Sequence, residues 1–103
     1  KPRVAARGKA AAVLQAYKFA PYGEEADKLR TLQLGSYEQR QNALRDWDML
    51  SERFPELKKF NPGLERSRVG GVLHYRLVVN SPKGGFRDLC NKMRSQQVEC
   101  LIK

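Results

Sequence analysis

The stretch Leu29-Arg30-Thr31-Leu32-Gln33-Leu34-Gly35-Ser36-Tyr37 alternates apolar and polar side chains over its central part. A period of two is typical of a strand with one buried face. Leu32 and Leu34 then point toward the core, whereas Thr31 and Gln33 point the other way. We therefore expect a strand here, with the rest of the chain packed around it.

A helix is expected almost directly after this strand. Gly35-Ser36 ends the alternation, and Ser36 with Gln39 three residues later matches a helix capping box. Pro55 stops the helix near residue 54. One apolar stripe at helical spacing contains Ala43, Leu44, Trp47, Leu50 and Phe54. This stripe indicates a core position for Trp47, with ligand stacking as the lesser alternative.

The remaining segments complete a regular order of elements. Residues 64–69 and 72–80 read as two strands joined by Gly70-Gly71, residues 86–93 as a helix, and residues 98–102 as a last strand. The order strand, helix, strand, strand, helix, strand predicts an α+β, ferredoxin-like split βαβ fold (βαββαβ). Its four-stranded antiparallel sheet carries two helices on one face.

The other face of such a sheet is open to solvent or to a ligand. Alternation places Thr31, Gln33, His74 and Arg76 on it. The contribution of the second strand depends on its register. A tight two-residue turn adds Glu65 and Ser67, and a shift by one residue adds Arg66 and Arg68 instead.

Composition restricts the partners. The 103 residues suffice for one domain, and the net charge of +9 favours nucleic acid, an acidic membrane or a carboxylate-bearing polymer. A basic surface kept for solubility is the alternative. No apolar run is long enough to span a bilayer. The chain begins with Lys1 and lacks a signal-peptide pattern, so we expect a fragment whose anchoring segment lies outside it.

Residues 1–28 differ in composition from residues 29–103, which we expect to form the domain. The first segment is basic and rich in alanine, as in a linker or tail. A membrane-surface helix is the alternative, since four side chains fall at helical spacing: Ala10, Val13, Leu14 and Tyr17. The weak apolar face that alanine provides favours the linker.

No catalytic constellation is visible in the sequence. His74 is the single histidine, and it has no carboxylate or nucleophile partner nearby in the chain. Gly84-Gly85 lacks the spacing of a phosphate-binding loop. Cys90 and Cys100 cannot collect four metal ligands. We therefore expect a binding module rather than an enzyme, without cofactor or metal.

Three motifs resemble one known family in the same order. Gln33-Leu34-Gly35-Ser36-Tyr37 resembles the first-strand signature of SPOR domains, and Tyr75-Arg76-Leu77-Val78-Val79 resembles their third strand. Leu89-Cys90 with Val98-Glu99-Cys100 resembles the close of many members. Two departures stand out: the segment 80–86 replaces a short Gly-Pro-Phe, and Gln97 stands where a glycine often precedes the last strand.

This resemblance implies a bacterial periplasmic module that binds peptidoglycan at the division septum. Its ligand would be glycan strands denuded of stem peptides, with divisome or cell-wall enzymes as further candidate partners. No nucleic-acid partner is expected, and a membrane would be reached only through an anchor outside this chain. Gln33 and Arg76 match family positions on the glycan-binding face. Strand parity and proximity add four residues to that face: Thr31, Ser36, Tyr37 and His74.

Two alternatives remain open at this point. An RNA-recognition-like module shares the order of elements, although it needs aromatic side chains on the open face to stack bases. Cys90 and Cys100 are expected to face one core, close enough to bond. They form either a disulfide, which an oxidising periplasm permits, or a pair of buried thiols.

Overall fold

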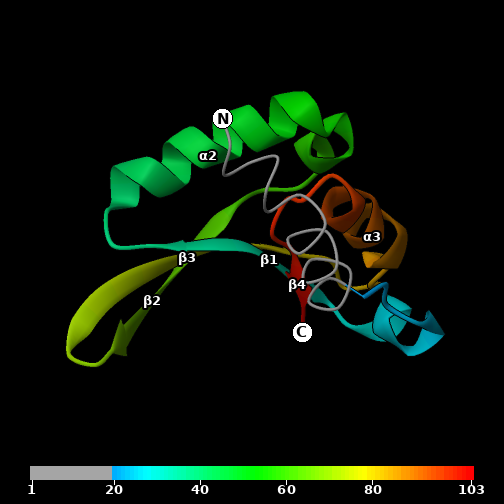
Figure 1. The fold of residues 1–103 in the computed structure, drawn as a ribbon, viewed down its shortest axis with the longest axis horizontal. Helices are drawn as coiled ribbons and strands as arrows, with labels where there is room; N and C mark the ends of the chain where they lie inside the picture. The colour runs from blue at the N-terminus through cyan, green and yellow to red at the C-terminus, as the bar shows by residue number, and fades with distance from the viewer. Residues whose placement is uncertain (1–19) are drawn as a thin grey trace, which may run out of the picture.

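The computed structural model describes residues 20–103. Its elements are η1 (Glu24–Lys28), β1 (Thr31–Tyr37), α2 (Arg40–Arg53), η2 (Pro55–Lys59), β2 (Gly63–Val69), β3 (Val72–Asn80), α3 (Arg87–Ser95) and β4 (Leu101–Ile102). The strands form one antiparallel sheet in the order β2-β3-β1-β4, shown edge-on in Figure 1. This architecture confirms the expected α+β fold, which is consistent with a ferredoxin-like arrangement.

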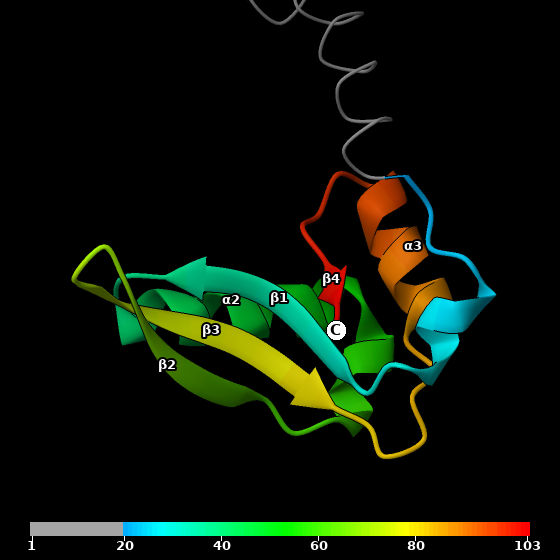
Figure 2. The same cartoon turned by 90° about the horizontal axis from the view of Figure 1, so that it is seen from below.

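Both α-helices pack on the same face of the sheet. One core cluster joins Leu50 of α2 with Cys90 and Met93 of α3, and the sheet adds Leu32 and Leu77. Figure 2, seen from below, shows the strands in front of α2, with α3 beside β4. No helix among residues 20–103 covers the opposite face of β2, β3 and β1, and we call it the open face.

The start of α2 differs from the capping-box expectation. Strand β1 continues through Ser36 to Tyr37, and Gln39 occupies the N-cap position of α2 without a side-chain capping bond. The capping-box prediction is wrong because Ser36 is held in the sheet opposite Arg76. The helix ends as expected, with Phe54 at its C-cap and fully buried.

Two short segments escaped the sequence reading. The segment after α2, where no helix or strand was predicted, contains the 3₁₀ helix η2, and its Leu57 is fully buried. The last strand is shorter than expected and covers only Leu101–Ile102. Leu57 and Ile102 are both buried, but segments this short show no hydrophobic period that would predict their bounds.

Positive backbone φ angles explain two of the chain reversals. Gly70 and Gly71 have φ of 59° and 83° in the two-residue turn that joins β2 to β3. Gln97 has φ of 64° directly after α3. The N–H groups of Gln97 and Val98 donate to the carbonyls of Arg94 and Met93, which makes a Schellman motif. A glycine at position 97, as in the resembled family, would adopt this angle without a Cβ penalty.

The segment before β1 docks on the rest of the fold. Tyr22 N–H donates to Asn91 Oδ1 at 2.8 Å, and Asn91 Nδ2 donates back to the Tyr22 carbonyl at 3.2 Å. The Ile102 N–H donates to the Tyr22 hydroxyl at 3.2 Å, and Ala26 of η1 is buried. These contacts join residues 22–28 to the domain that was expected to begin at residue 29. The helix considered for residues 10–17 lies outside the described residues.

Candidate functional site

The register of the sheet defines which side chains share the open face. Directly paired residues of neighbouring strands lie on the same side of a sheet. Ser36 of β1 and Glu65 of β2 both pair with Arg76 of β3, and Ser67 pairs with His74. The tight-turn alternative for the second strand is therefore the one found. Arg66 pairs with Tyr75 and faces the helix side.

A β-bulge in β1 changes the expected alternation. Gln33 pairs with Val78, whereas Gly35 pairs with Leu77, so Leu34 is the extra residue. Beyond this point the faces are exchanged relative to a regular strand. Ser36 comes to the open face, and Tyr37 turns to the helix side.

The assignment of Tyr37 to the open face is therefore wrong. Its hydroxyl donates to Asp46 Oδ2 of α2 at 2.6 Å. Burial, followed by this hydrogen bond and the negative charge of Asp46, raises the pKa of Tyr37 above its ordinary value. The ring lies over Gly35, where a Cβ would come within 2.8 Å of Tyr37 Cζ. Gly35 thus makes room for a ring that ties the sheet to α2.

Arg76 lies at the centre of the open face. It belongs to β3, an inner strand, and its paired neighbours are Ser36 and Glu65. The side chain is half-buried and makes no hydrogen bond or ion pair within residues 20–103. A guanidinium carries five N–H donors in a planar fork. Arg76 can therefore offer its full donor set to an anionic ligand.

Gln33 lies near Arg76 and has a cationic neighbour. Lys103 Nζ donates to Gln33 Oε1 at 2.8 Å and lies 3.7 Å from Glu65 Oε1. The Gln33 carbonyl is thus occupied, while its amide N–H groups have no partner in the described chain. Lys103 also neutralises part of the charge of Glu65. The centre of the face therefore presents two cations and one carboxylate.

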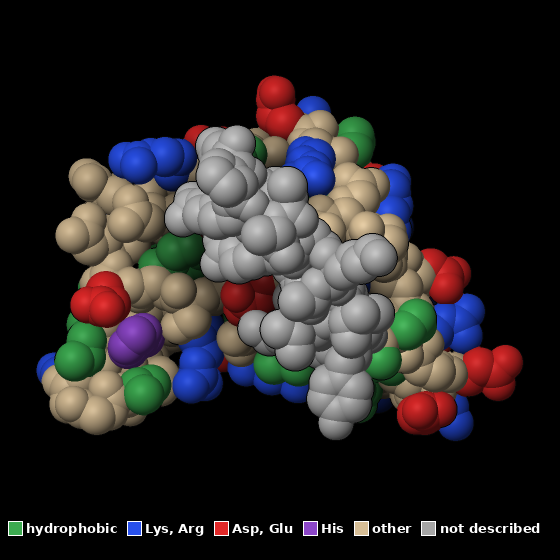
Figure 3. Space-filling view, in the orientation of Figure 1, with side chains coloured by type: hydrophobic (Ala, Val, Ile, Leu, Met, Phe, Trp, Pro, Cys, Tyr) green, Lys and Arg blue, Asp and Glu red, His purple; other side chains and the backbone are tan. Residues whose placement is uncertain are grey.

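The other predicted residues lie on either side of this centre. Thr31 Oγ1 donates to Asn80 Oδ1 at 2.8 Å at one end. Ser36 Oγ and His74 Nδ1 are 3.5 Å apart toward the hairpin end, where Figure 3 shows the single histidine at the surface. No carboxylate within residues 20–103 contacts His74, so this serine–histidine pair has no third member to orient it.

Four polar residues of the open face were not predicted as site residues: Asn80, Glu65, Ser67 and Lys103. Parity with Arg76 would have identified Asn80, and parity with Ile102 would have identified Lys103. Glu65 and Ser67 were left open because the register of the second strand was not decided.

The two cysteines belong to the buried core between the helices and the sheet. Cys90 of α3 and Cys100 are both buried and form a disulfide, with their Cα atoms 5.6 Å apart. The bond ties α3 to the segment that enters β4. Both cysteines belong to the buried core and not to the open face, so the role of the disulfide is structural.

The open face can bind anions and hydrogen-bonding groups. Within the described part of the chain, no group of histidine, cysteine and carboxylate side chains could hold a metal ion. No helix among residues 20–103 has the length and hydropathy to cross a bilayer.

Comparison with protein-family models, with curated proteins and with solved structures finds no match for this chain.

Proposed function

We propose that this chain is a non-catalytic module that binds peptidoglycan glycan strands denuded of stem peptides. The observation that carries the proposal is Arg76, which is central on the open face, half-buried, and without an ion pair in residues 20–103. The resemblance of the strands around Gln33 and Arg76 to SPOR domains points to the same ligand.

The chemistry of the ligand suits these side chains. Removing the stem peptide from muramic acid leaves a lactyl carboxylate, so a denuded strand carries repeated negative charges. A guanidinium can bind a carboxylate through two parallel hydrogen bonds. Acetamido groups of the sugars offer carbonyl acceptors, and the Gln33 amide has N–H donors to meet them. Ser36 adds a hydroxyl beside Arg76.

RNA binding through the same face receives less support. RNA-recognition modules of this topology stack bases on aromatic side chains of the open face. Tyr37 and Tyr75 pair with each other on the helix side, and the open-face residues of β1, β2 and β3 include no Phe, Tyr or Trp, so His74 is their only aromatic side chain. One imidazole toward the hairpin end offers less stacking area than the two or three aromatic rings of such modules.

Under this proposal, the protein acts in the periplasm of a bacterium, close to the septum. Cell-wall sacculi provide the direct test. The purified chain should co-sediment with amidase-treated sacculi, and much less with intact sacculi or with structured RNA. Equal recovery with treated and intact sacculi would contradict recognition of denuded strands, and preferential recovery with RNA would favour the alternative function.

A further inference from the structure

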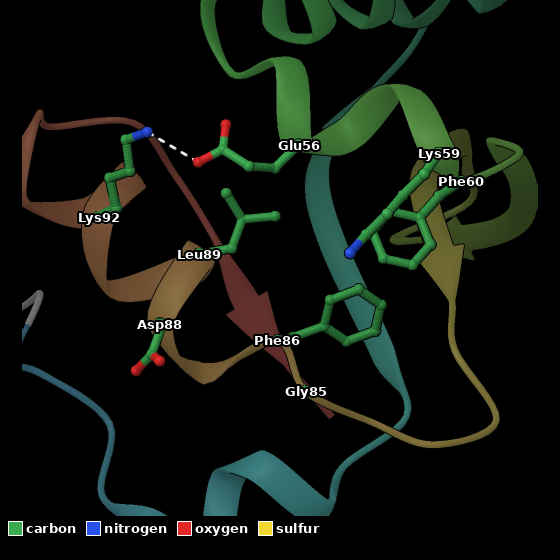
Figure 4. Close-up of a pocket in the computed structure, with 8 residues that line it drawn as sticks. All are labelled: Glu56, Lys59, Phe60, Gly85, Phe86, Asp88, Leu89 and Lys92. Atoms are coloured by element: carbon green, nitrogen blue, oxygen red, sulfur yellow. Dashed lines mark hydrogen bonds and ion pairs between the residues drawn. The ribbon is translucent and has the colours of Figure 1, made fainter.

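A cleft lies away from the open face, between η2 and α3 (Figure 4). Its volume is about 290 Å³. The lining residues all come from η2, α3 and the positions that border them: Glu56, Lys59, Phe60, Gly85, Phe86, Asp88, Leu89 and Lys92. No strand contributes to this lining, so occupation of the cleft leaves the open face accessible.

The floor of the cleft is apolar and partly aromatic. The rings of Phe60 and Phe86 are in tilted contact, with their centroids 5.2 Å apart. Leu89 stands across from these rings in Figure 4. Gly85 borders the same space, and a Cβ built there meets no atom within 4 Å. The floor can therefore take one planar ring against the partly exposed Phe60 and Leu89, with the buried Phe86 ring behind Phe60, in the tilted or offset geometry that aromatic side chains favour.

The charged groups on the rim are not equivalent. Lys92 Nζ donates to Glu56 Oε2 at 2.8 Å, and this bond lowers the pKa of the Glu56 carboxyl. Asp88 accepts from Arg87 Nε at 3.1 Å. Lys59, by contrast, makes no ion pair within the described chain and lies over the Phe60 ring, with Nζ 5.3 Å from the centroid.

We infer that this cleft binds an aromatic side chain of a partner protein, with a carboxylate on the residue next to it. The ring packs on Phe60 and Leu89, and the carboxylate pairs with the Lys59 ammonium. The size of the cleft matches a single large side chain rather than a whole helix. This inference does not rest on glycan binding, because the two surfaces share no residue.

A short peptide tests the inference directly. The probe is acetyl-Gly-Asp-Phe-Gly-amide, titrated into the full ¹⁵N-labelled chain and followed by amide chemical shifts. We expect shifts at Gly85, Phe86 and Leu89, with a Kd on the order of 1 mM for so small a contact. The same peptide with Asn for Asp tests the carboxylate, and the peptide with Ala for Phe tests the ring. Each of these peptides should bind more weakly than the probe.

Two adjacent lysines provide matched variants. Lys59→Glu should weaken binding of the probe about fivefold, the upper range for an exposed ion pair. Lys58→Glu makes the same charge change one residue away, outside the cleft lining, and should change binding less than about twofold. Absence of shifts at the cleft, equal binding of the phenylalanine and alanine peptides, or equal losses in both variants would overturn the inference.

Discussion

Ser36 in β1 lies directly opposite Arg76 in β3, although a regular alternation from Leu32 would turn Ser36 toward the core. The bulge between Gln33 and Gly35 produces this relationship. As a result, the guanidinium at the centre of the open face has the Ser36 hydroxyl beside it, where a strand without the bulge would place Gly35. The first prediction follows from this arrangement.

Replacing Arg76 by alanine should weaken binding to denuded glycan by about 1.5–3 kcal/mol, the range of a hydrogen bond to a charged group. Gln33→Ala should cost about 0.5–1.5 kcal/mol, as a neutral hydrogen bond does. Isothermal titration with amidase-treated glycan measures both changes, and added salt should weaken binding further. Arg66→Ala is the matched control, because Arg66 belongs to the neighbouring strand but faces the helix side. Unchanged binding of the folded double variant would refute the open-face site.

Tyr37→Phe should lower the unfolding free energy at neutral pH by about 1.5 kcal/mol, since the hydrogen bond to the Asp46 carboxylate is lost. The pKa of Tyr37 is raised above its ordinary value of 10.0 in the folded protein, chiefly by burial. Its contribution is therefore complete below pH 10 and is lost as the pH rises further. Urea unfolding between neutral pH and about pH 11 should show a steeper loss in the parent chain than in Tyr37→Phe. Parallel curves above pH 10 would contradict this account.

The disulfide should make a large contribution to stability. Cys90 and Cys100 are separated by 10 residues in sequence. Closing a loop of this size removes conformational entropy from the unfolded chain, worth about 3 kcal/mol. A double variant with alanine at both positions should lose roughly that amount in chemical unfolding under non-reducing conditions. Addition of a reductant should destabilise the parent chain and leave the double variant unchanged; a reductant effect of equal size in both would exclude the disulfide as the cause.

Two truncations test the docking of the segment before β1. A chain that begins at residue 29 loses the hydrogen bonds of Tyr22 and the burial of Ala26. It should be less stable than a chain that begins at residue 20 by about 2–4 kcal/mol, for hydrogen bonds and a half-buried ring together. Thermal unfolding of the two chains gives the comparison. Equal midpoints would show that the domain does begin at residue 29.

Gln97→Gly should stabilise the protein by about 0.5–1 kcal/mol. A left-handed backbone costs a residue with a Cβ roughly 1–2 kcal/mol, and the greater flexibility of unfolded glycine offsets part of the gain. Gln96→Gly is the control, since Gln96 has a negative φ of −99°. Denaturant midpoints should rise for the first variant and fall for the second. A fall of the midpoint in both variants would contradict the view that the left-handed backbone at Gln97 is strained.

The elements that are long enough to show a clear hydrophobic period could be predicted from the sequence. The helix that ends at Phe54 and the hairpin around Gly70-Gly71 appear where the pattern places them, although Leu44 of the predicted apolar stripe is 39% exposed. The bulge was not predictable in the same way, because Leu34 is buried with or without it. Strand parity therefore predicted the correct face of the sheet for Gln33 and Arg76 but the wrong face for Tyr37, which lies beyond the bulge. The docking of Tyr22 depends on contacts with Asn91 and Ile102, which no local pattern reveals.

The contact between Tyr22 and Ile102 joins residues 80 positions apart in the chain. Lys103 reaches Gln33 across 70 positions, and β4 pairs with β1 at a similar distance. Pairings of such long range form slowly, because the intervening chain must first be ordered. We therefore expect the β2–β3 hairpin to form early and the closing of the sheet by β4 to come last. Lys103 can reach Gln33 only after β4 has joined β1, so the cationic side of the open face is completed in the last step of folding.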